Sequence, residues 1–339
     1  MQKHLINKDA PIVEALRALN TLSGNVMTLF VTDSDGRLLG SLTDGDVRRA
    51  LLAEHSLDTP VGAICRKDCL KLSGDSENMN VIAEARRRKV SLLPVVDGGI
   101  IVSLVDLTRR RGLLPVDAVL MAGGAGERLR PLTESVPKPL LPVGGKPIID
   151  HNIELLHSFG IENIYVTVNY LKDKIIEHFR QTEPTVKCVA EPSRLGTAGS
   201  LGLIPSFSSP YVLLMNSDLL TDVNLEAMLL RHIDTEAAMT MAVVPYTVSV
   251  PFALVEHQGD RITALSEKPT YNYYANAGIY LMNVDVAKEI DGKTPLDAPA
   301  LAESLIERGL RVSLFNIGSG RWIDIGSPDD YRHACELMK

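Results

Sequence analysis

Residues 122–149 read AGGAGERLRPLTESVPKPLLPVGGKPII, and this stretch says more about the fold than any other. It follows the apolar run VDAVLM, which is typical of a buried strand. Three glycines then let backbone N–H groups approach an anion closely; they are Gly123, Gly124 and Gly126. Arg128 and Lys138 add positive charge suited to a polyphosphate. The spacing fits neither a P-loop, which needs Lys-Ser/Thr after the glycines, nor a dinucleotide fingerprint.

Strand-like and helical stretches alternate along the rest of the chain. We expect strands at residues 163–169, 186–191, 211–218 and 237–244, and helices at 148–159, 171–180, 198–203 and 225–233. This alternation predicts an α/β fold with a doubly wound, mostly parallel, Rossmann-like sheet. Ligands of such sheets bind at the carboxyl ends of the strands, where the glycine-rich stretch lies.

Five further motifs follow in order. They are EPSRLGTAGSL at 191–201, NSD at 216–218, SEKP at 266–269, NAGIY at 276–280 and WIDIGSPDDY at 322–331. Together with the glycine-rich stretch, they resemble the sugar-1-phosphate nucleotidyltransferases, which have a GT-A-like fold, over residues 116–336. The resemblance implies an enzyme that joins a nucleoside triphosphate to a sugar 1-phosphate and releases pyrophosphate, with Mg²⁺ as its cofactor.

The resemblance also implies residue roles. The catalytic residues would be Arg128, Lys138, Asp218, Lys268 and Asp324, with Asp218 and Asp324 as the metal ligands. The nucleotide would be bound by Ala122, Gly123, Gly124, Gly126, Glu191, Gly196 and Thr197. The sugar would be bound by Glu267, Asn276 and Gly278. The alternatives are that Asp324 caps a turn and that Asn276 is a turn residue. Since the attacking phosphate is already anionic, positioning and charge neutralisation should carry the catalysis.

The choice of nucleotide depends on two conflicting features. Glu127 stands where many relatives carry threonine, and GER occurs in some uridylyltransferases, whereas LGTAGSL at 195–201 resembles the guanylyltransferases. We therefore expect GTP, with mannose 1-phosphate or glucosamine 1-phosphate, for surface-glycan or nonulosonate biosynthesis. A uridylyltransferase and a catalytically idle nucleotide sensor are the alternatives.

The N-terminal third contains a degenerate repeat. GSLTDGDVRR at 40–49 and IIVSLVDLTR at 100–109 each place a hydroxyl three positions before an aspartate. The pairs are Thr43 with Asp46 and Ser103 with Asp106. Each copy predicts helix, strand, turn, strand and helix. At a strand-to-helix turn these side chains could hold a nucleotide or simply cap the helix.

The repeat resembles a tandem pair of CBS domains at residues 1–58 and 59–114, which implies an adenine nucleotide as ligand and association into a homo-oligomer. Ile100 replaces Gly40 in the second copy, which weakens the expectation of a second ligand site. We expect the basic run at 86–89 to be the solvated face of a helix rather than a nucleic-acid site.

Charge supports a boundary near residue 114. Residues 1–114 carry a net charge of +2. Residues 115–339, the expected catalytic domain, carry a net charge of −9, and the two add up to −7 for the whole chain. An acidic chain of this kind is unlike a nucleic-acid-binding protein. No apolar run approaches a membrane span, and the N-terminus lacks a signal-peptide core. The four cysteines form no CxxC pair, which favours free thiols in a reducing compartment. We therefore expect a cytoplasmic protein without a membrane or nucleic-acid partner.

Overall fold

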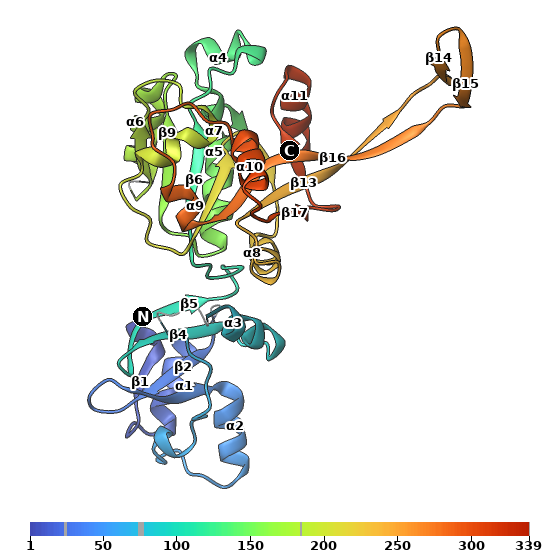
Figure 1. Ribbon diagram of the computed structural model, residues 1–339. Helices are drawn as coiled ribbons and strands as arrows, with labels where there is room; N and C mark the ends of the chain where they lie inside the picture. The colour runs from blue at the N-terminus through green and yellow to red at the C-terminus, as the bar shows by residue number, and fades with distance from the viewer. Residues whose placement is uncertain (24–25, 74–77, 184, 339) are drawn as a thin grey trace. The chain divides into compact units, whose positions relative to one another are not determined.

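The computed structural model describes residues 1–23, 26–73, 78–183 and 185–338 (Figure 1). The chain divides into two compact units. The first contains residues 1–114 together with 158–160, and the second contains 115–157 and 161–339. Within the described residues no helix is long and apolar enough to cross a membrane. The four cysteines are free thiols.

The first repeat forms a small three-stranded sheet with two helices. Its elements are η1 (Gln2–His4), β1 (Leu5–Asn7), α1 (Ile12–Thr21), β2 (Thr28–Thr32), β3 (Leu38–Thr43), α2 (Asp44–Leu52) and η2 (Val61–Ala63). The strand order is β1-β2-β3, with β1 parallel to β2 and β3 antiparallel to it. The helical spacing of Ile12 and Leu19 places both side chains on the buried face of α1, against Val47 of α2.

The second repeat has its own apolar cluster but is shorter. It contains α3 (Asn78–Arg87), β4 (Leu92–Asp97) and β5 (Ile100–Asp106), with Ile82 and Leu93 in its core. The helix that we predicted after β5 is absent, because residues 107–109 form a turn. Asp106 accepts hydrogen bonds from the N–H and hydroxyl of Thr108 instead of capping a helix. Gly112 and Pro115 follow at once, and both disfavour helix in the short segment before the next strand.

The second unit is built on a seven-stranded sheet. Its strands are β6 (Val116–Ala122), β9 (Ile164–Val168), β10 (Lys187–Ala190), β11 (Tyr211–Asn216), β13 (Met239–Ser249), β16 (Thr270–Asn283) and β17 (Val312–Asn316). Their order is β10-β9-β6-β11-β16-β13-β17, and every neighbouring pair is parallel except the two that involve β16. The predicted mostly parallel α/β sheet is confirmed.

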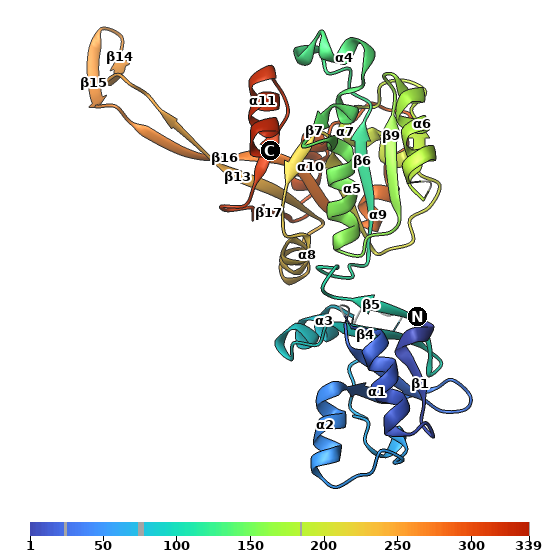
Figure 2. The same ribbon diagram turned by 180° about the vertical axis from the view of Figure 1, so that it is seen from behind.

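Helices cover both faces of this sheet. The longer ones are α5 (Ile148–Ser158), α6 (Lys172–Thr182), α8 (Leu225–Asp234), α10 (Ala298–Glu307) and α11 (Pro328–Leu337), and α7 (Gly196–Gly199), η5 (Ser200–Leu203) and α9 (Val284–Lys288) are short. Figures 1 and 2 bring α10 and α5 to the front in opposite views, so these two helices lie on opposite faces. Leu301 and Leu305 of α10 pack with Val212 and Leu214 of β11 in the main core.

Small elements follow the glycine-rich stretch and close the site. They are η3 (Glu127–Leu129), α4 (Leu132–Ser135), η4 (Lys138–Leu140), β7 (Pro142–Val143), β8 (Lys146–Pro147), β12 (Leu219–Thr221) and β18 (Trp322–Asp324). A second cluster holds them together, with Leu129, Leu141, Leu220 and Ile325 buried in it.

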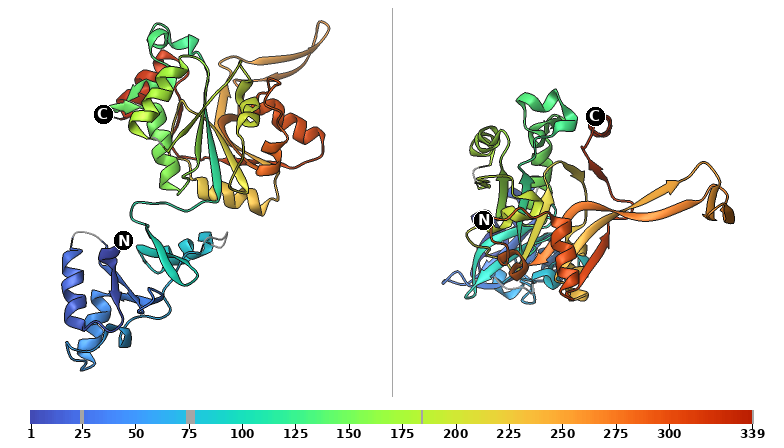
Figure 3. Two further views of the ribbon diagram at one scale, coloured as in Figure 1. Left: turned by 90° about the vertical axis from the view of Figure 1, so that its left-hand side faces the viewer. Right: turned by 45° about the horizontal axis from the view of Figure 1, so that its top comes forward.

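A long two-stranded ribbon was not predicted from the sequence. β13 and β16 continue beyond the sheet as paired strands, and the hairpin of β14 (Leu254–Gln258) and β15 (Arg261–Ser266) forms its end. We call residues 244–275 the arm. Figures 1, 2 and 3 agree that it projects from the rest of the second unit. A register shift between Met241 and Val243 marks the point where the ribbon leaves the sheet.

Candidate active site

A short strand pair brings two distant carboxylates together. β12 and β18 are antiparallel, with Leu219 opposite Asp324, and the N–H of Ile325 donates to the carbonyl oxygen of Asp218 at 3.1 Å. Asp218 lies in the turn after β11, at the carboxyl end of this central strand. The fold therefore places Asp218 and Asp324 side by side, although 105 residues lie between them in the sequence.

Lys138 lies against both carboxylates. Its ammonium group forms an ion pair with Asp218 Oδ2 and lies 3.8 Å from Asp324 Oδ1, and only 12% of its side chain is exposed. Burial raises the pKa of Asp324, and the charge of Asp218 raises it further, against the opposing effects of Lys138 and Arg128. Two crowded carboxylates of this kind favour a bound cation.

The two carboxylates fit a divalent metal. Asp218 Oδ1 and Asp324 Oδ1 are buried and accept no hydrogen bond from any described residue. Free carboxylate oxygens are the ligands that Mg²⁺ prefers, usually one or two from protein, with phosphates and water completing the shell. No cluster of three or more His, Cys, Asp or Glu side chains suited to a metal occurs within the described part of the chain. Two protein ligands are therefore what this site offers.

A cavity of about 430 Å³ lies over the glycine-rich stretch. The predicted residues that line it are Gly123, Gly124, Glu191, Gly196, Thr197 and Asp218. Arg194 and Asn216 also line it and were not predicted, although both lie within motifs that we had recognised. Ala122 is buried at the end of β6 and does not reach the cavity surface. The cavity is therefore made largely of the residues expected to bind a nucleotide.

Each of the three glycines has different surroundings in the structure. A side chain at Gly124 would meet nothing within 4 Å, so its backbone faces open space. A Cβ at Gly123 would lie 3.0 Å from Glu191 Oε1, and one at Gly126, where φ is +61°, would lie 2.9 Å from Thr133. Gly126 thus shapes the loop from beneath, and its carbonyl accepts from the Thr133 hydroxyl at 2.8 Å. Only the first two approach the cavity.

Glu191 is a carboxyl group at the wall of this cavity. Its side chain is buried, and burial raises its pKa despite a hydrogen bond from the Leu195 N–H at 3.4 Å.

A second cavity of about 320 Å³ adjoins the first. Thr197 and Asn216 line both cavities, whereas Asn276, Gly278 and Asp324 line only the second. A Cβ at Gly278, where φ is +70°, would lie 2.5 Å from Asn216 Nδ2, so no side chain fits there. Asp218 and Asp324 therefore lie where the two cavities meet.

Asn276 forms hydrogen bonds to nearby residues of its own strand and also lines the second cavity. Its side-chain oxygen accepts from the Gly278 N–H at 3.0 Å, and its amide donates to the Tyr280 hydroxyl at 2.6 Å. Asp297, Pro299 and Trp322 were missed by the sequence reasoning and line this cavity too. Asp297 accepts from the Thr197 N–H at 3.0 Å, a contact between segments that no local pattern reveals.

Besides Ala122, Gly126 and Lys138, three more predicted residues line neither of these cavities. Glu267 and Lys268 belong to the arm, are exposed and line neither of these two cavities. Arg128 is exposed, and its guanidinium lies beside Gly326, where a Cβ would come within 3.1 Å of it. Arg128 is therefore near Asp324, whereas the structure does not bring Glu267 and Lys268 to the carboxylates.

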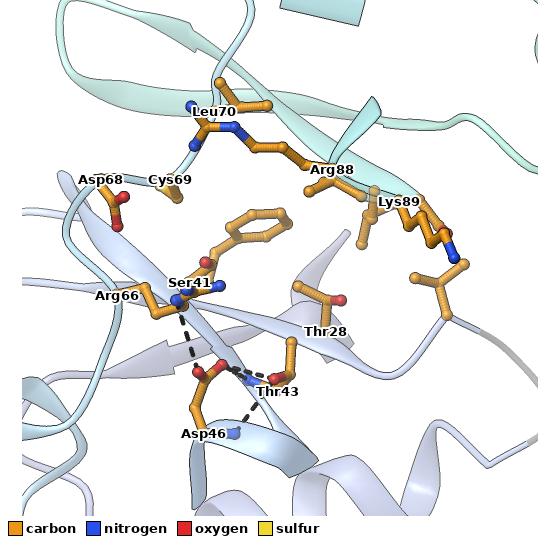
Figure 4. A pocket seen from close by; sticks show the side chains of 15 residues that line it. Thr28, Ser41, Thr43, Asp46, Arg66, Asp68, Cys69, Leu70, Arg88 and Lys89 are labelled. Atoms are coloured by element: carbon orange, nitrogen blue, oxygen red, sulfur yellow. Dashed lines mark hydrogen bonds and ion pairs between the residues drawn. The ribbon is translucent and has the colours of Figure 1, made fainter. Parts of the chain in front are cut away.

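The first unit has a cavity of about 510 Å³ between its repeats (Figure 4). Thr43 and Asp46 line it from the first repeat, Arg66 from the segment after η2, and Arg88 and Lys89 from the second repeat. Arg66, Arg88 and Lys89 were not predicted as site residues. We expected the basic run at 86–89 to be only a solvated helix face; Arg88 and Lys89 are exposed, yet they border the cavity.

Thr43 and Asp46 form a capping box at the start of α2. Asp46 Oδ2 accepts from the Thr43 N–H at 2.9 Å and from its hydroxyl at 2.6 Å. Burial acts to raise the pKa of Asp46, but these hydrogen bonds and Arg49 outweigh it and lower that pKa. Ser103 and Asp106, the equivalent residues of the second repeat, do not line the cavity. The capping interpretation thus describes Thr43, although both side chains remain accessible to a ligand.

Comparison with known families agrees with this geometry. A model described as nucleotidyl transferase matches residues 117–339, which is more than half of the chain. The chain belongs to the nucleotidyl transferase family. A CBS domain model matches residues 3–53 of the first unit. The family resemblance stated from the motifs is confirmed.

Two relatives of this nucleotidyl transferase are a protein named as a guanylyltransferase and the bifunctional protein GlmU. Mannose-1-phosphate guanylyltransferase 1 of Arabidopsis thaliana is 32% identical over 234 residues, covering 65% of this chain and 64% of that protein. The bifunctional protein GlmU of Methanococcus maripaludis strain C7 is 32% identical over 230 residues, covering 65% and 53%. The matched segment thus spans less than two thirds of either relative.

Solved structures share the fold of the nucleotidyl transferase unit. HddC from Yersinia pseudotuberculosis is 24% identical with a TM-score of 0.52, covering 66% of this chain and 99% of its own. The inositol-1-phosphate CTP transferase from T. maritima is 21% identical with a TM-score of 0.51, covering 67% and 96%.

Proposed function

We propose that residues 115–339 transfer a nucleotidyl group from a nucleoside triphosphate to a sugar 1-phosphate, with release of pyrophosphate. The observation that carries this proposal is the group of Lys138, Asp218 and Asp324 at the junction of two cavities. Each carboxylate has a buried oxygen without a hydrogen-bond donor among the described residues. A two-substrate reaction at phosphorus needs two adjoining cavities with cations at their junction.

The nucleotide would occupy the cavity over the glycine-rich stretch. Backbone N–H groups at Gly123 and Gly124 would approach the triphosphate, and Glu191 and Thr197 would face the base and ribose. Arg128, near Asp324, would neutralise charge that develops on the departing pyrophosphate. Mg²⁺ on Asp218 and Asp324 would supply the charge neutralisation that brings the two polyanions together.

The sugar 1-phosphate would occupy the second cavity, beside Asn276 and Gly278. One of its phosphate oxygens forms a bond to the α-phosphorus as the bond to the β-phosphate oxygen breaks. Pyrophosphate leaves with that electron pair, and no proton has to move. Lys138 would contact the α-phosphate and hold the reacting groups in line.

We propose GTP as the nucleotide and mannose 1-phosphate or glucosamine 1-phosphate as the sugar phosphate, in surface-glycan or nonulosonate biosynthesis. Motif LGTAGSL and the name of the Arabidopsis relative support GTP. Glu127 at the wall of the nucleotide cavity is the observation that favours UTP as second candidate.

We further propose that residues 1–114 are a tandem CBS pair that binds one adenine nucleotide and that the protein is a cytoplasmic homo-oligomer. Arg66, Arg88 and Lys89 around the cavity of about 510 Å³ support a phosphate-bearing ligand. The four free thiols support a reducing compartment.

The deciding experiment is a pyrophosphate-release assay with Mg²⁺ over a panel of triphosphates and sugar 1-phosphates. We expect release with GTP and one of the two named sugar phosphates, and mass spectrometry should detect the matching GDP-sugar. Release only with UTP would replace the nucleotide assignment. Nucleotide binding without release from any pair would refute the enzyme proposal in favour of an idle sensor.

A further inference from the structure

The arm carries an apolar face with no partner in the described chain. Tyr246 pairs with Tyr273 and Val248 with Tyr271 across the ribbon, so all four side chains point to one face. Both Tyr246 and Tyr273 are 58% exposed, and the Tyr271 and Tyr273 rings stack with centroids 6.4 Å apart.

The opposite face of the ribbon is mixed: it begins with the pair of Pro245 and Tyr274 and is polar beyond it. The side chains on it include Thr247 and Asn272, which form a hydrogen bond at 3.0 Å, and Ser249 and Thr270. The hairpin continues the pattern, because Val255 and Leu265 are opposite one another and exposed. A two-stranded ribbon has little stability by itself in water, and a large exposed apolar patch marks an interaction surface.

The second cavity lacks what the arm carries. Among the residues that line it are the carboxylates Asp297 and Asp324, and none of its lining residues is lysine or arginine. The neighbouring Lys138 is already paired with Asp218 and Asp324. A further cation, beside Mg²⁺ and Lys138, would help to neutralise a sugar 1-phosphate in this cavity. Lys268 is an exposed lysine shortly after β15, and it takes part in none of the salt bridges found between residues that the structure describes.

The ribbon holds Lys268 away from the cavity of its own chain. Asn276 lines that cavity, and Thr270 lies six residues earlier in the same strand. At about 3.3 Å per residue, these two backbones are roughly 20 Å apart, and Lys268 lies beyond Thr270. The ladder from Val244–Ala275 to Ser249–Thr270 is unbroken, so a return to the same chain would have to break it.

We propose that the arm of one copy closes the second cavity of another copy, so that Lys268 and Glu267 complete the sugar-phosphate site in trans. Lys268 would pair with the phosphate, Glu267 would accept from sugar hydroxyls, and the tyrosine face would be covered between the copies. A reciprocal exchange closes as a two-fold dimer with both sites complete. This inference rests on the proposed function for the substrate, but the exchange of arms does not.

Crosslinking tests the exchange independently of activity. Lys268→Cys and Pro299→Cys, the latter at the cavity wall, are made in separate chains, mixed and oxidised. We expect a covalent dimer whose disulfide joins positions 268 and 299, which peptide mass spectrometry identifies. Oxidised wild-type protein controls for the four native thiols. A disulfide within one chain of the double variant, or no disulfide between these positions in the mixture, overturns the proposal.

Complementation tests its catalytic meaning. Lys268→Ala and Asp218→Asn should each be inactive alone. Mixed in equal amounts and allowed to exchange, they should recover about a quarter of wild-type turnover, because half of the dimers are mixed and each has one intact site. No recovery, with exchange verified by mass, would mean that the arm acts within its own chain and would overturn the proposal. A wild-type protein without activity would refute the proposed function and leave the crosslinking result to decide the exchange.

The apolar face provides the final test. The double variant Tyr246→Ser with Tyr273→Ser should weaken the contact between the arms of two copies. We therefore expect it to abolish the disulfide crosslink between positions 268 and 299. Thr247→Ala with Asn272→Ala, on the opposite face, is the matched control and should leave the crosslink intact. Equal crosslinking in both double variants would show that the tyrosine face is not the contact, against the proposal.

Discussion

The backbone carbonyl of Asp218 accepts a hydrogen bond from the N–H of Ile325 at 3.1 Å, which locks the two halves of the proposed metal site together. The contact belongs to the two-stranded ladder of β12 and β18. Because it uses only backbone atoms, both carboxylates remain free to bind a cation while their main chains stay fixed. The side chains of Asp218 and Asp324 can therefore be changed without removing the contact that positions them.

Asp218→Asn should lower turnover by about 10²–10³-fold or more, since it removes one of two carboxylates that hold charge against the phosphates. The backbone ladder is unaffected, so the thermal unfolding midpoint should stay within a few degrees of wild type. Pyrophosphate release across a Mg²⁺ titration measures the first effect and circular dichroism the second. Asp222→Asn, whose carboxylate accepts from the Arg321 N–H outside the cavities, is the control. Turnover that survives in the Asp218 variant would exclude the metal role.

Gly278→Ala should destabilise the protein by about 2–4 kcal/mol. A positive φ costs a non-glycine residue roughly 1–2 kcal/mol, and the added Cβ would collide with Asn216 at 2.5 Å. Gly309→Ala is the matched control, because φ is +75° there and nothing lies within 4 Å. Urea unfolding of both variants separates conformational cost from collision. Equal losses would contradict the close packing of Gly278 on Asn216.

The stability of Glu191→Gln, measured against that of wild type, should be higher at neutral pH than under acid conditions. Burial raises the pKa of Glu191 in the folded protein, so its stabilising contribution is present below the unfolded value and is lost as pH rises through the folded value. Glutamine has no such loss and keeps an acceptor for the Leu195 N–H. The difference in unfolding midpoint should therefore grow from about pH 4 upward. A difference that shrinks as pH rises would mean that the glutamate is stabilised as an anion.

The sequence predicted the sheet well because its strands leave strong local signals, whereas the metal role of Asp218 and Asp324 stays a prediction. The buried strands β6, β9 and β11 are mostly apolar, and Asp218 lies in the turn after β11. The glycine-rich stretch is likewise recognisable from its composition alone. These features depend on neighbours in the sequence, and so a single chain suffices to find them.

The features that were missed depend on contacts between distant segments. Asp297 contacts Thr197 at a sequence separation of 100, and Arg66 contacts Asp46 from beyond the first repeat. The arm was missed for another reason, because its alternation of tyrosine with threonine and asparagine resembles any half-buried strand. Only the structure reveals that its apolar face is uncovered. The prediction of a helix after β5 was wrong. It rested on the symmetry of the repeat, whereas Gly112 and Pro115 both disfavour a helix there.

The asymmetry of the first unit yields the last prediction. Asp46 lines the cavity and Asp106 does not, so Asp46→Ala should abolish adenine-nucleotide binding to the first unit while Asp106→Ala retains it. Asp46→Ala also removes the capping box, which costs about 1–2 kcal/mol. Because the pKa of Asp46 is lowered on folding, that contribution is present at neutral pH and lost as pH falls through the folded value.

Calorimetry of full-length variants with ATP or AMP measures the binding, and urea unfolding at neutral and acid pH measures the stability. Arg88→Ala separates the two effects, because it removes a cation from the cavity without touching the capping box: binding should weaken while the pH dependence of stability remains. Equal loss of binding in the Asp46 and Asp106 variants would require two symmetric sites, which the turn at 107–109 opposes by leaving Asp106 bonded to Thr108.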